Sequence, residues 1–254
     1  MSAVAKLALA VAAVAMFGPL LFKGASHSWA SEPWHRADRS SAGLAPDPRT
    51  TPEAVVQVYA APTYGWRGIF AVHAWIAVKD ANAPRYDRWD VMGWGRGRVV
   101  RENYDGPDHR WFGRDPQVLV DIRGDRAAAL IPQIREAVAD YPWPETYRTF
   151  PGPNSNTFVA FVSRRVPDLG LDLPPTAIGK DYRPLNDPIG HAPSGGGLQL
   201  SLLGLAGLIV APAEGIEINL LGLGVGIDIA DPALRLPGIG RIGVTPSAAR
   251  AQTE

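Results

Sequence analysis

The sequence has no cysteine and no net charge: its 254 residues include 25 Lys and Arg against 25 Asp and Glu. Without cysteine there can be no disulfide, no thiolate metal site and no cysteine nucleophile. A balanced charge argues against nucleic-acid binding, which needs a basic face. The five histidines lack the spacing typical of metal ligands, so we expect neither a bound metal nor another cofactor.

Apolar residues make up 46% of the chain and charged residues 20%. This composition is typical of a folded protein with a substantial core rather than of a disordered chain. Composition therefore excludes several function classes, and any positive indication of function must come from local motifs.

The N-terminus contains an uncharged run, residues 7–22, between Lys6 and Lys23. Its length lies between a signal-peptide core of about 7–15 residues and a membrane span of about 20. We expect residues 1–25 to anchor the protein in membrane lipid of the inner membrane, with the remainder facing the periplasm. A signal cleaved after the small-x-small pattern at 28–30, with export, is one alternative, and a buried soluble helix is another.

The rest of the chain divides by composition. Residues 26–53 are polar and rich in Pro and Ser, which is typical of a linker or a surface arm. Residues 54–195 alternate strand-like and helix-like patterns and predict an α+β domain. Residues 196–245 are apolar and rich in Gly, which favours a β extension of hairpin strands, and 246–254 form a tail. Strands are expected at 54–60, 68–79, 85–93, 98–104 and 118–123.

The run at 68–79 is apolar on both faces of a strand, with Val72, Ala74 and Ile76 on one face and His73 and Trp75 on the other. This pattern predicts a central strand covered on both sides. Two helices should follow. One begins with an N-cap at 124–125 and ends near residue 140; the other runs from 154 to 166 and ends before a proline.

Two features could support chemistry. His73 is the only ionisable side chain in its apolar strand, and the turn at 151–158 places Ser155 at a helix N-terminus. Unpaired N–H groups and the dipole of a first helical turn stabilise negative charge on an attacking atom or an oxyanion, while a histidine supplies the base. Asp87 or Asp90 could orient the imidazole. Since the two carboxylates are three residues apart, they point to opposite faces of a strand and at most one can do so.

The order of a His-bearing strand and then a nucleophile-bearing helix resembles the circularly permuted papain-like group, which includes NlpC-type and lecithin retinol acyltransferase-like proteins. The segment Asn154-Ser155-Asn156-Thr157-Phe158 is similar to their nucleophile motif, with serine in place of cysteine. The chain beyond residue 28 more closely resembles a proteobacterial family, domain-of-unknown-function family 3750, in GIFAVHAWIAVK, RYDRWDVMGWGRG and PGPNSNTFVAFV. The resemblance implies a permuted papain-like fold, with an antiparallel sheet packed on the nucleophile-position helix, but no established activity.

Two functions remain open. The chain could be a binding or scaffolding module whose papain-like groove no longer catalyses, or a Ser-His amidase, esterase or acyltransferase. In the second case Ser155 would carry the acyl group, His73 would be the base, and the substrate would be a cell-envelope component. Alternatively, Asn154 and Ser155 only cap their helix and His73 is an inert buried histidine. An envelope glycan, peptide or lipid is the expected ligand, and the expected binding residues are Asn154, Asn156, Thr157, Trp75 and Trp94.

Overall fold

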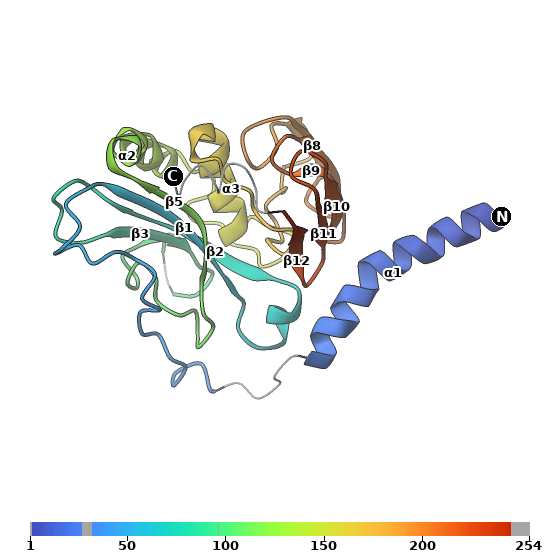
Figure 1. The fold of residues 1–254 in the computed structure, drawn as a ribbon, viewed down its shortest axis with the longest axis horizontal. Helices are drawn as coiled ribbons and strands as arrows, with labels where there is room; N and C mark the ends of the chain where they lie inside the picture. The colour runs from blue at the N-terminus through green and yellow to red at the C-terminus, as the bar shows by residue number, and fades with distance from the viewer. Residues whose placement is uncertain (1, 27–31, 96, 245–254) are drawn as a thin grey trace.

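The computed structural model describes residues 2–26, 32–95 and 97–244 (Figure 1). Within them lie two antiparallel sheets, two helices packed on the first sheet, and an N-terminal helix that projects from the rest of the molecule. The cleavage pattern predicted at 28–30 and the tail predicted at 246–254 lie outside the described residues.

The first sheet has five strands in the order β4-β3-β2-β1-β5, and every neighbouring pair is antiparallel. The strands form where Val, Ile and aromatic residues are dense, as their preference for a pleated, buried surface requires. Their bounds are Val55–Pro62 for β1, Val72–Lys79 for β2, Asp87–Val91 for β3, Val100–Glu102 for β4 and Gln117–Arg123 for β5. The predicted strand at 68–79 is wrong in its first part, because Gly65–Ile69 form a 3-10 helix, η1.

Two helices, α2 (Gly124–Ala139) and α3 (Ser155–Arg165), pack on one face of this sheet. Their buried side chains join Ala74, Ile76 and Val78 of β2 in the main hydrophobic core. A short 3-10 helix, η2 (Pro167–Leu169), follows α3. The predicted N-cap of the first helix is wrong, since Arg123 holds that position and makes no side-chain cap.

The opposite face of the first sheet carries Trp75 and Ala77 in a second core. Residues of the 32–53 arm and the loop before β5 cover it. Asp108 in that loop accepts hydrogen bonds from Ser41 Oγ (2.8 Å) and from the Leu44 amide (2.6 Å). The strand β2 is thus buried on both faces, as its two-sided apolar pattern predicts.

The second sheet contains seven strands in the order of the chain, β6 to β12. They span Ile189–Gly190, Leu198–Leu202, Ala206–Ala211, Gly215–Leu220, Leu223–Asp228, Ala233–Leu236 and Gly240–Gly243. Side chains that alternate along β7 to β12 point outward and are exposed and aliphatic. This aliphatic face consists of Leu198, Leu200, Leu202, Leu208, Val210, Ile216, Ile218, Leu220, Ile227, Leu234 and Ile242.

The inward face of the second sheet is polar instead. Glu217 of β9 is buried between the Lys180 ammonium (2.9 Å) and the Arg235 guanidinium (2.7 Å). Arg235 also pairs with Asp172 at 2.7 Å. Burial alone would raise the pKa of the Glu217 carboxyl, but the two cations more than offset this and hold its pKa below the usual range. Paired charges therefore connect the second sheet to Asp172 and Lys180, which lie in the loop after η2.

The N-terminal helix α1 (Ala3–Ser26) contacts η1, β10 and β11 near its C-terminal end. In the part of the chain that the structure describes, no helix has both the length and the apolar character needed to cross a membrane. The predicted anchor at residues 1–25 therefore gains no support from the structure.

The α+β class with antiparallel sheets is confirmed by these elements. A helix that begins at the predicted nucleophile position does pack on the sheet that carries His73. The permuted papain-like arrangement as a whole remains a prediction.

Replacing Glu217 with Gln tests the role of the buried charges. Lys180 and Arg235 would lose their shared carboxylate inside the protein, and breaking a buried pair costs about 3–5 kcal/mol. We expect the free energy of unfolding, measured by denaturant titration, to fall by that amount. Asp187→Asn is the control, because Asp187 pairs with Arg183 at the surface and should change stability by less than about 1 kcal/mol. Equal losses in both variants would contradict the assignment.

Candidate functional site

A cavity of about 1160 Å³ opens where β2 begins, and it is lined from several elements. Its walls include η1, the start of β2, the loop after β3, the N-terminus of α3, Leu20 of α1, and Leu221 and Leu223 at the β9–β10 turn. Most of the lining side chains are aromatic or aliphatic. Its basic side chains are Arg39, Arg67 and His73, and no carboxylate lines the cavity among the described residues.

The N-terminus of α3 is held by a capping box. Asn154 is the N-cap, its Oδ1 accepts from the amides of Asn156 (3.0 Å) and Thr157 (3.2 Å), and Thr157 Oγ1 accepts from the Asn154 amide (3.1 Å). The capping alternative is thus confirmed for Asn154 and wrong for Ser155. Ser155 occupies the first helical position, and within the described chain its hydroxyl has no hydrogen-bond partner. Its amide, like other first-turn amides, has no intrahelical carbonyl to bind.

His73 is fixed from two sides. Its Nε2 lies 2.9 Å from Asp90 Oδ1, and its ring stacks on Trp111 with centroids 3.6 Å apart and planes 9° apart. Asp90 also accepts two hydrogen bonds from Arg88, at 2.6 and 3.0 Å, and Arg88 lies over the Trp75 ring at 4.3 Å. The carboxylate requires a proton on Nε2, so the neutral imidazole leaves Nδ1 as an acceptor.

The electrostatics favour a neutral imidazole. Burial lowers the pKa of His73, and the nearby Arg88 charge lowers it further against the opposing effect of Asp90. Burial would raise the pKa of Asp90, but Arg88 and the hydrogen bond from His73 outweigh it and hold that pKa below the usual range. Arg88 therefore neutralises the carboxylate that would otherwise stabilise an imidazolium.

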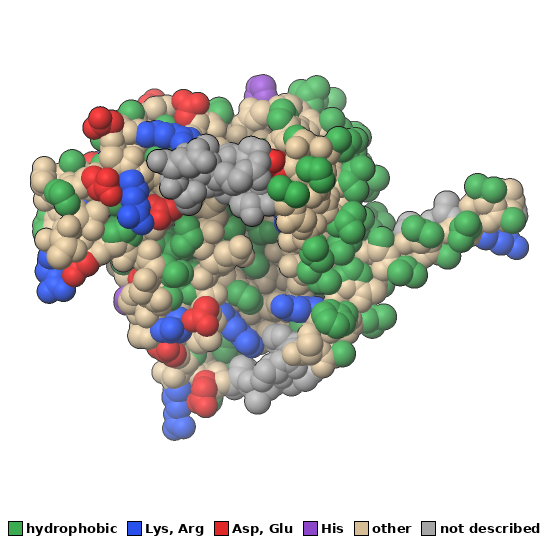
Figure 2. All heavy atoms as spheres, viewed as in Figure 1, with side chains coloured by type: hydrophobic (Ala, Val, Ile, Leu, Met, Phe, Trp, Pro, Cys, Tyr) green, Lys and Arg blue, Asp and Glu red, His purple; other side chains and the backbone are tan. Residues whose placement is uncertain are grey.

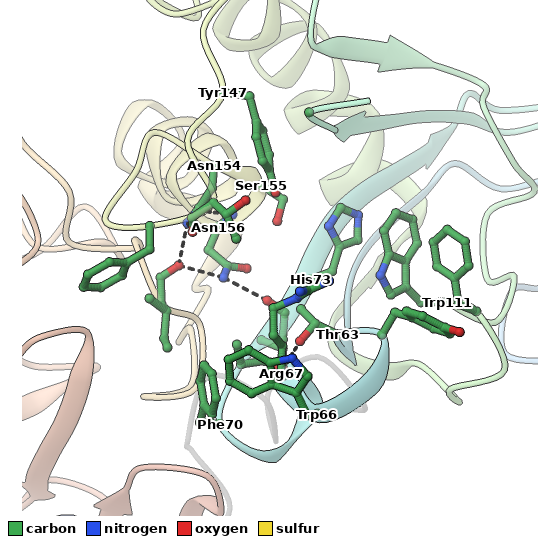
Figure 3. A pocket seen from close by; sticks show the side chains of 18 of the residues that line it. Thr63, Trp66, Arg67, Phe70, His73, Trp111, Tyr147, Asn154, Ser155 and Asn156 are labelled. Atoms are coloured by element: carbon green, nitrogen blue, oxygen red, sulfur yellow. Dashed lines mark hydrogen bonds between the residues drawn. The ribbon is translucent and has the colours of Figure 1, made fainter. Parts of the chain in front are cut away.

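Ser155 and His73 line the same cavity. Figure 3 shows Ser155 and Asn156 on α3 and His73 on β2 around one hollow, with Tyr147 directed into it. His73 lies opposite Ala61 of β1, on the face of β2 that carries Trp75, whereas α3 packs on the other face. No hydrogen bond joins the two residues. The cavity lies at the start of β2, and it can therefore be lined by Ser155 from one side of the sheet and by His73 from the other.

The other expected site residues fall into two groups. Asn154, Asn156 and Trp94 line the cavity, and Asn156 Nδ2 donates to the carbonyls of Val72 and Ile178, both at 2.9 Å. Thr157 and Trp75 are buried outside the lining, so the geometry does not support them as binding residues.

The two predicted aspartates have different surroundings. Asp87 pairs with Arg135 at 2.8 Å, away from His73, while Asp90 contacts the imidazole. The three-residue spacing predicted that at most one of the two carboxylates could orient His73, and only Asp90 does so.

Several residues of the site had not been predicted from the sequence. The spacing of Arg88 and Asp90 by two residues places them on one face of β3, which was a usable signal. Trp111 and Arg39 come from loops, and Arg67 comes from the short 3-10 helix η1; none of these segments has a periodic pattern. Tyr147 packs over Gly93, where a Cβ would lie 2.3 Å from its ring, so only glycine leaves space for this wall of the cavity.

Residues 53–182 match the model of a protein family of unknown function, DUF3750, and the chain belongs to that family. No curated protein and no solved structure matches the chain. The matched segment contains the first sheet, both of its helices, and the His73, Asp90 and Ser155 positions.

The lowered pKa of His73 predicts how stability depends on pH. Its ordinary pKa is 6.5, so on acidification the unfolded imidazole binds a proton that the buried one does not. The contribution of His73 to stability is therefore complete above that value and is lost progressively below it. We expect the loss of unfolding free energy between about pH 8 and about pH 5.5 to be smaller in His73→Gln than in the wild type.

The exposed His35→Gln serves as the control and should keep the wild-type pH dependence. Denaturant titrations at both pH values measure the difference. A wild-type dependence in His73→Gln would show that His73 is not held neutral.

Proposed function

We propose that the chain binds, in the cavity at the start of β2, an amphipathic ligand with an acyl chain and an anionic head group. The observation that carries this proposal is the composition of the cavity wall. It is mainly aromatic and aliphatic, it includes two arginines, and it has no carboxylate among the described residues.

The volume supports a large apolar ligand. Sites for drug-sized molecules enclose about 300–1,000 Å³, and this cavity is about 1160 Å³. Apolar walls from η1, α1 and the β9–β10 turn would bury an extended hydrocarbon chain, which is favourable in proportion to the area removed from water.

The polar groups of the wall suit an anionic head. Arg67 is exposed on η1 and forms no ion pair with the described residues, and Arg39 lies 4.2 Å from the Phe112 ring centroid. The free amide and hydroxyl of Ser155 offer two further donors. A neutral His73 adds Nδ1 as an acceptor. An inner-membrane location facing the periplasm, which the N-terminal sequence favours, would supply such ligands.

An acyl chain with a glycerol-phosphate head group, as in lysophosphatidylglycerol, is a suitable probe. Arg67→Gln should weaken its binding about tenfold, because a hydrogen bond to a charged group contributes about 1.5 kcal/mol or more. A monoacylglycerol of the same chain length should bind equally to variant and wild type. Changes in tryptophan fluorescence report both, since Trp66, Trp94 and Trp111 line the cavity.

Arg165→Gln is the matched control, because Arg165 lies at the opposite end of α3 and pairs with Asp140. It should leave both affinities unchanged. Failure of the wild type to bind either probe would overturn the proposal. If Arg67→Gln lowered the affinity for both probes equally, Arg67 would not recognise the head group, and the proposal would lose its anionic part.

Ser-His acyl chemistry is the second candidate function, and the free hydroxyl of Ser155 favours it. In that reaction Ser155 Oγ attacks the carbonyl carbon of an ester or amide and its proton moves to His73 Nδ1. The leaving alcohol or amine takes that proton, and water then hydrolyses the acyl-serine through the same base. The neutralisation of Asp90 by Arg88 and the position of His73 on the other face of β2 weigh against it.

A fluorophosphonate probe, which labels activated serines, distinguishes the two functions. We expect the wild type to remain unlabelled while it still binds the acyl probe. Labelling that is lost in Ser155→Ala and kept in the control Ser40→Ala would instead establish the Ser-His reading. Intact-mass spectrometry measures the adduct directly.

A further inference from the structure

The second sheet has its polarity reversed relative to a sheet that faces water. Such a sheet turns apolar side chains to the core and polar ones to solvent. Here Glu217 and Arg235 point inward, and their strand neighbours Ile216, Ile218 and Leu234 point outward. Ile218 is 58% exposed, whereas Glu217 is 1% exposed.

The outward aliphatic side chains are in register across six strands. One row runs through Leu198, Val210, Ile216, Ile227, Leu234 and Ile242, which are paired strand by strand. Figure 2 shows these apolar side chains gathered over β8 to β12, with the apolar surface continuing towards α1. A contiguous exposed apolar surface of this kind marks an interaction site.

The chemistry of the aliphatic face fits hydrocarbon better than protein. Protein interfaces are enriched in Tyr, Trp and Arg and form about one hydrogen bond per 100–200 Å². The aliphatic face consists of Leu, Ile and Val alone and offers no side-chain donor or acceptor. Lipid acyl chains need none.

The elements beside the aliphatic face carry cations and no acids. Helix α1 contains Lys6 and Lys23, and η1 contains Arg67 next to Trp66, which is 58% exposed. Helix α1 and η1 both pack closely against Gly238 of the second sheet. A Cβ at Gly238 would lie 2.8 Å from Leu20 Cδ2 of α1 and 2.9 Å from the Ile69 carbonyl oxygen of η1. Lys and Arg at a bilayer surface are attracted to anionic head groups, and Trp prefers the same interfacial zone.

From these observations we infer that the aliphatic face of the second sheet, flanked by α1 and η1, docks on the surface of a bilayer that contains anionic lipid. The sheet inserts its Leu, Ile and Val side chains at the boundary of head groups and acyl chains, as interfacial elements do. Lys23 and Arg67 meet the head groups.

The cavity is lined in part by the elements beside the aliphatic face. Leu20, Leu221 and Leu223 line it and belong to α1 and to the β9–β10 turn of the second sheet. A docked protein would therefore hold its cavity beside the lipid phase. Docking itself depends on the aliphatic face and not on the ligand proposed above.

Vesicle flotation of the full-length chain tests the inference. The wild type should float with vesicles of phosphatidylcholine and phosphatidylglycerol, and less with phosphatidylcholine alone. The double variant Ile218→Asp, Ile227→Asp should lower the bound fraction about tenfold, because it puts two charges into the apolar boundary. Both positions are exposed, so the fold should be retained, and far-ultraviolet circular dichroism checks this.

Leu185→Asp is the matched control, since Leu185 is 61% exposed but lies in the loop before β6, outside the aliphatic face. It should float like the wild type. Equal flotation of wild type and double variant would overturn the inference, as would no flotation of the wild type. A dimer in analytical ultracentrifugation that the double variant dissociates, without flotation, would assign the face to a second copy instead. Lysophosphatidylglycerol binding by the double variant should be unchanged, which separates failure of docking from failure of the ligand proposal.

Discussion

The buried contact of Glu217 with Lys180 and Arg235 connects the second sheet to the loop that follows η2. Charges taken out of water are tolerated only when they are paired, so packing of the sheet on this loop has to bring these three side chains together. Hydrogen bonds from Asn219 to Asp181 and from Arg164 to Gln199 support the same packing. Leu221 and Leu223, which follow β9 in the same sheet, line the cavity.

The same contact explains why the second sheet is apolar on its outside. A strand has two faces, and once Glu217, Asn219 and Arg235 are turned inward, Ile216, Ile218 and Leu234 have to point outward. Helix α1 contacts both η1 and the second sheet, and residues of all three line the cavity. The proposed ligand binding and the proposed surface docking would therefore involve the same elements.

His73 shows how residue types and their electrostatics can point to different functions. A histidine bonded to an aspartate near a serine at a helix N-terminus is the residue set of a hydrolase. Arg88 changes its chemistry, because it takes up the charge of Asp90 and disfavours the imidazolium that a general base must form. Burial of the His73 ring against Trp111 also disfavours the imidazolium. These contacts favour a rigid, neutral wall of a binding cavity.

Much of the fold could be predicted from the sequence because the signals are local. The two-sided apolar run identified β2 as a central strand, and the Asn154 cap with the apolar stripe after it located α3. The candidate site could be predicted from the sequence only in part. The His73 and Ser155 positions stand out along the chain, whereas Trp111 and Arg39 reach the cavity from loops and Arg67 from the short helix η1, all without a periodic pattern.

The sequence by itself located most of β1 to β5 and the helices α2 and α3, because periodicity and capping act over a few residues. It also limited the imidazole partner to one of Asp87 and Asp90. Only the tertiary structure decided that Asp90 is that partner, that Arg88 neutralises it, and that the aliphatic side of the second sheet faces outward. Alternation defines two faces of a strand but not which one is buried, since that depends on pairings such as Lys180 with Glu217, far apart in the chain.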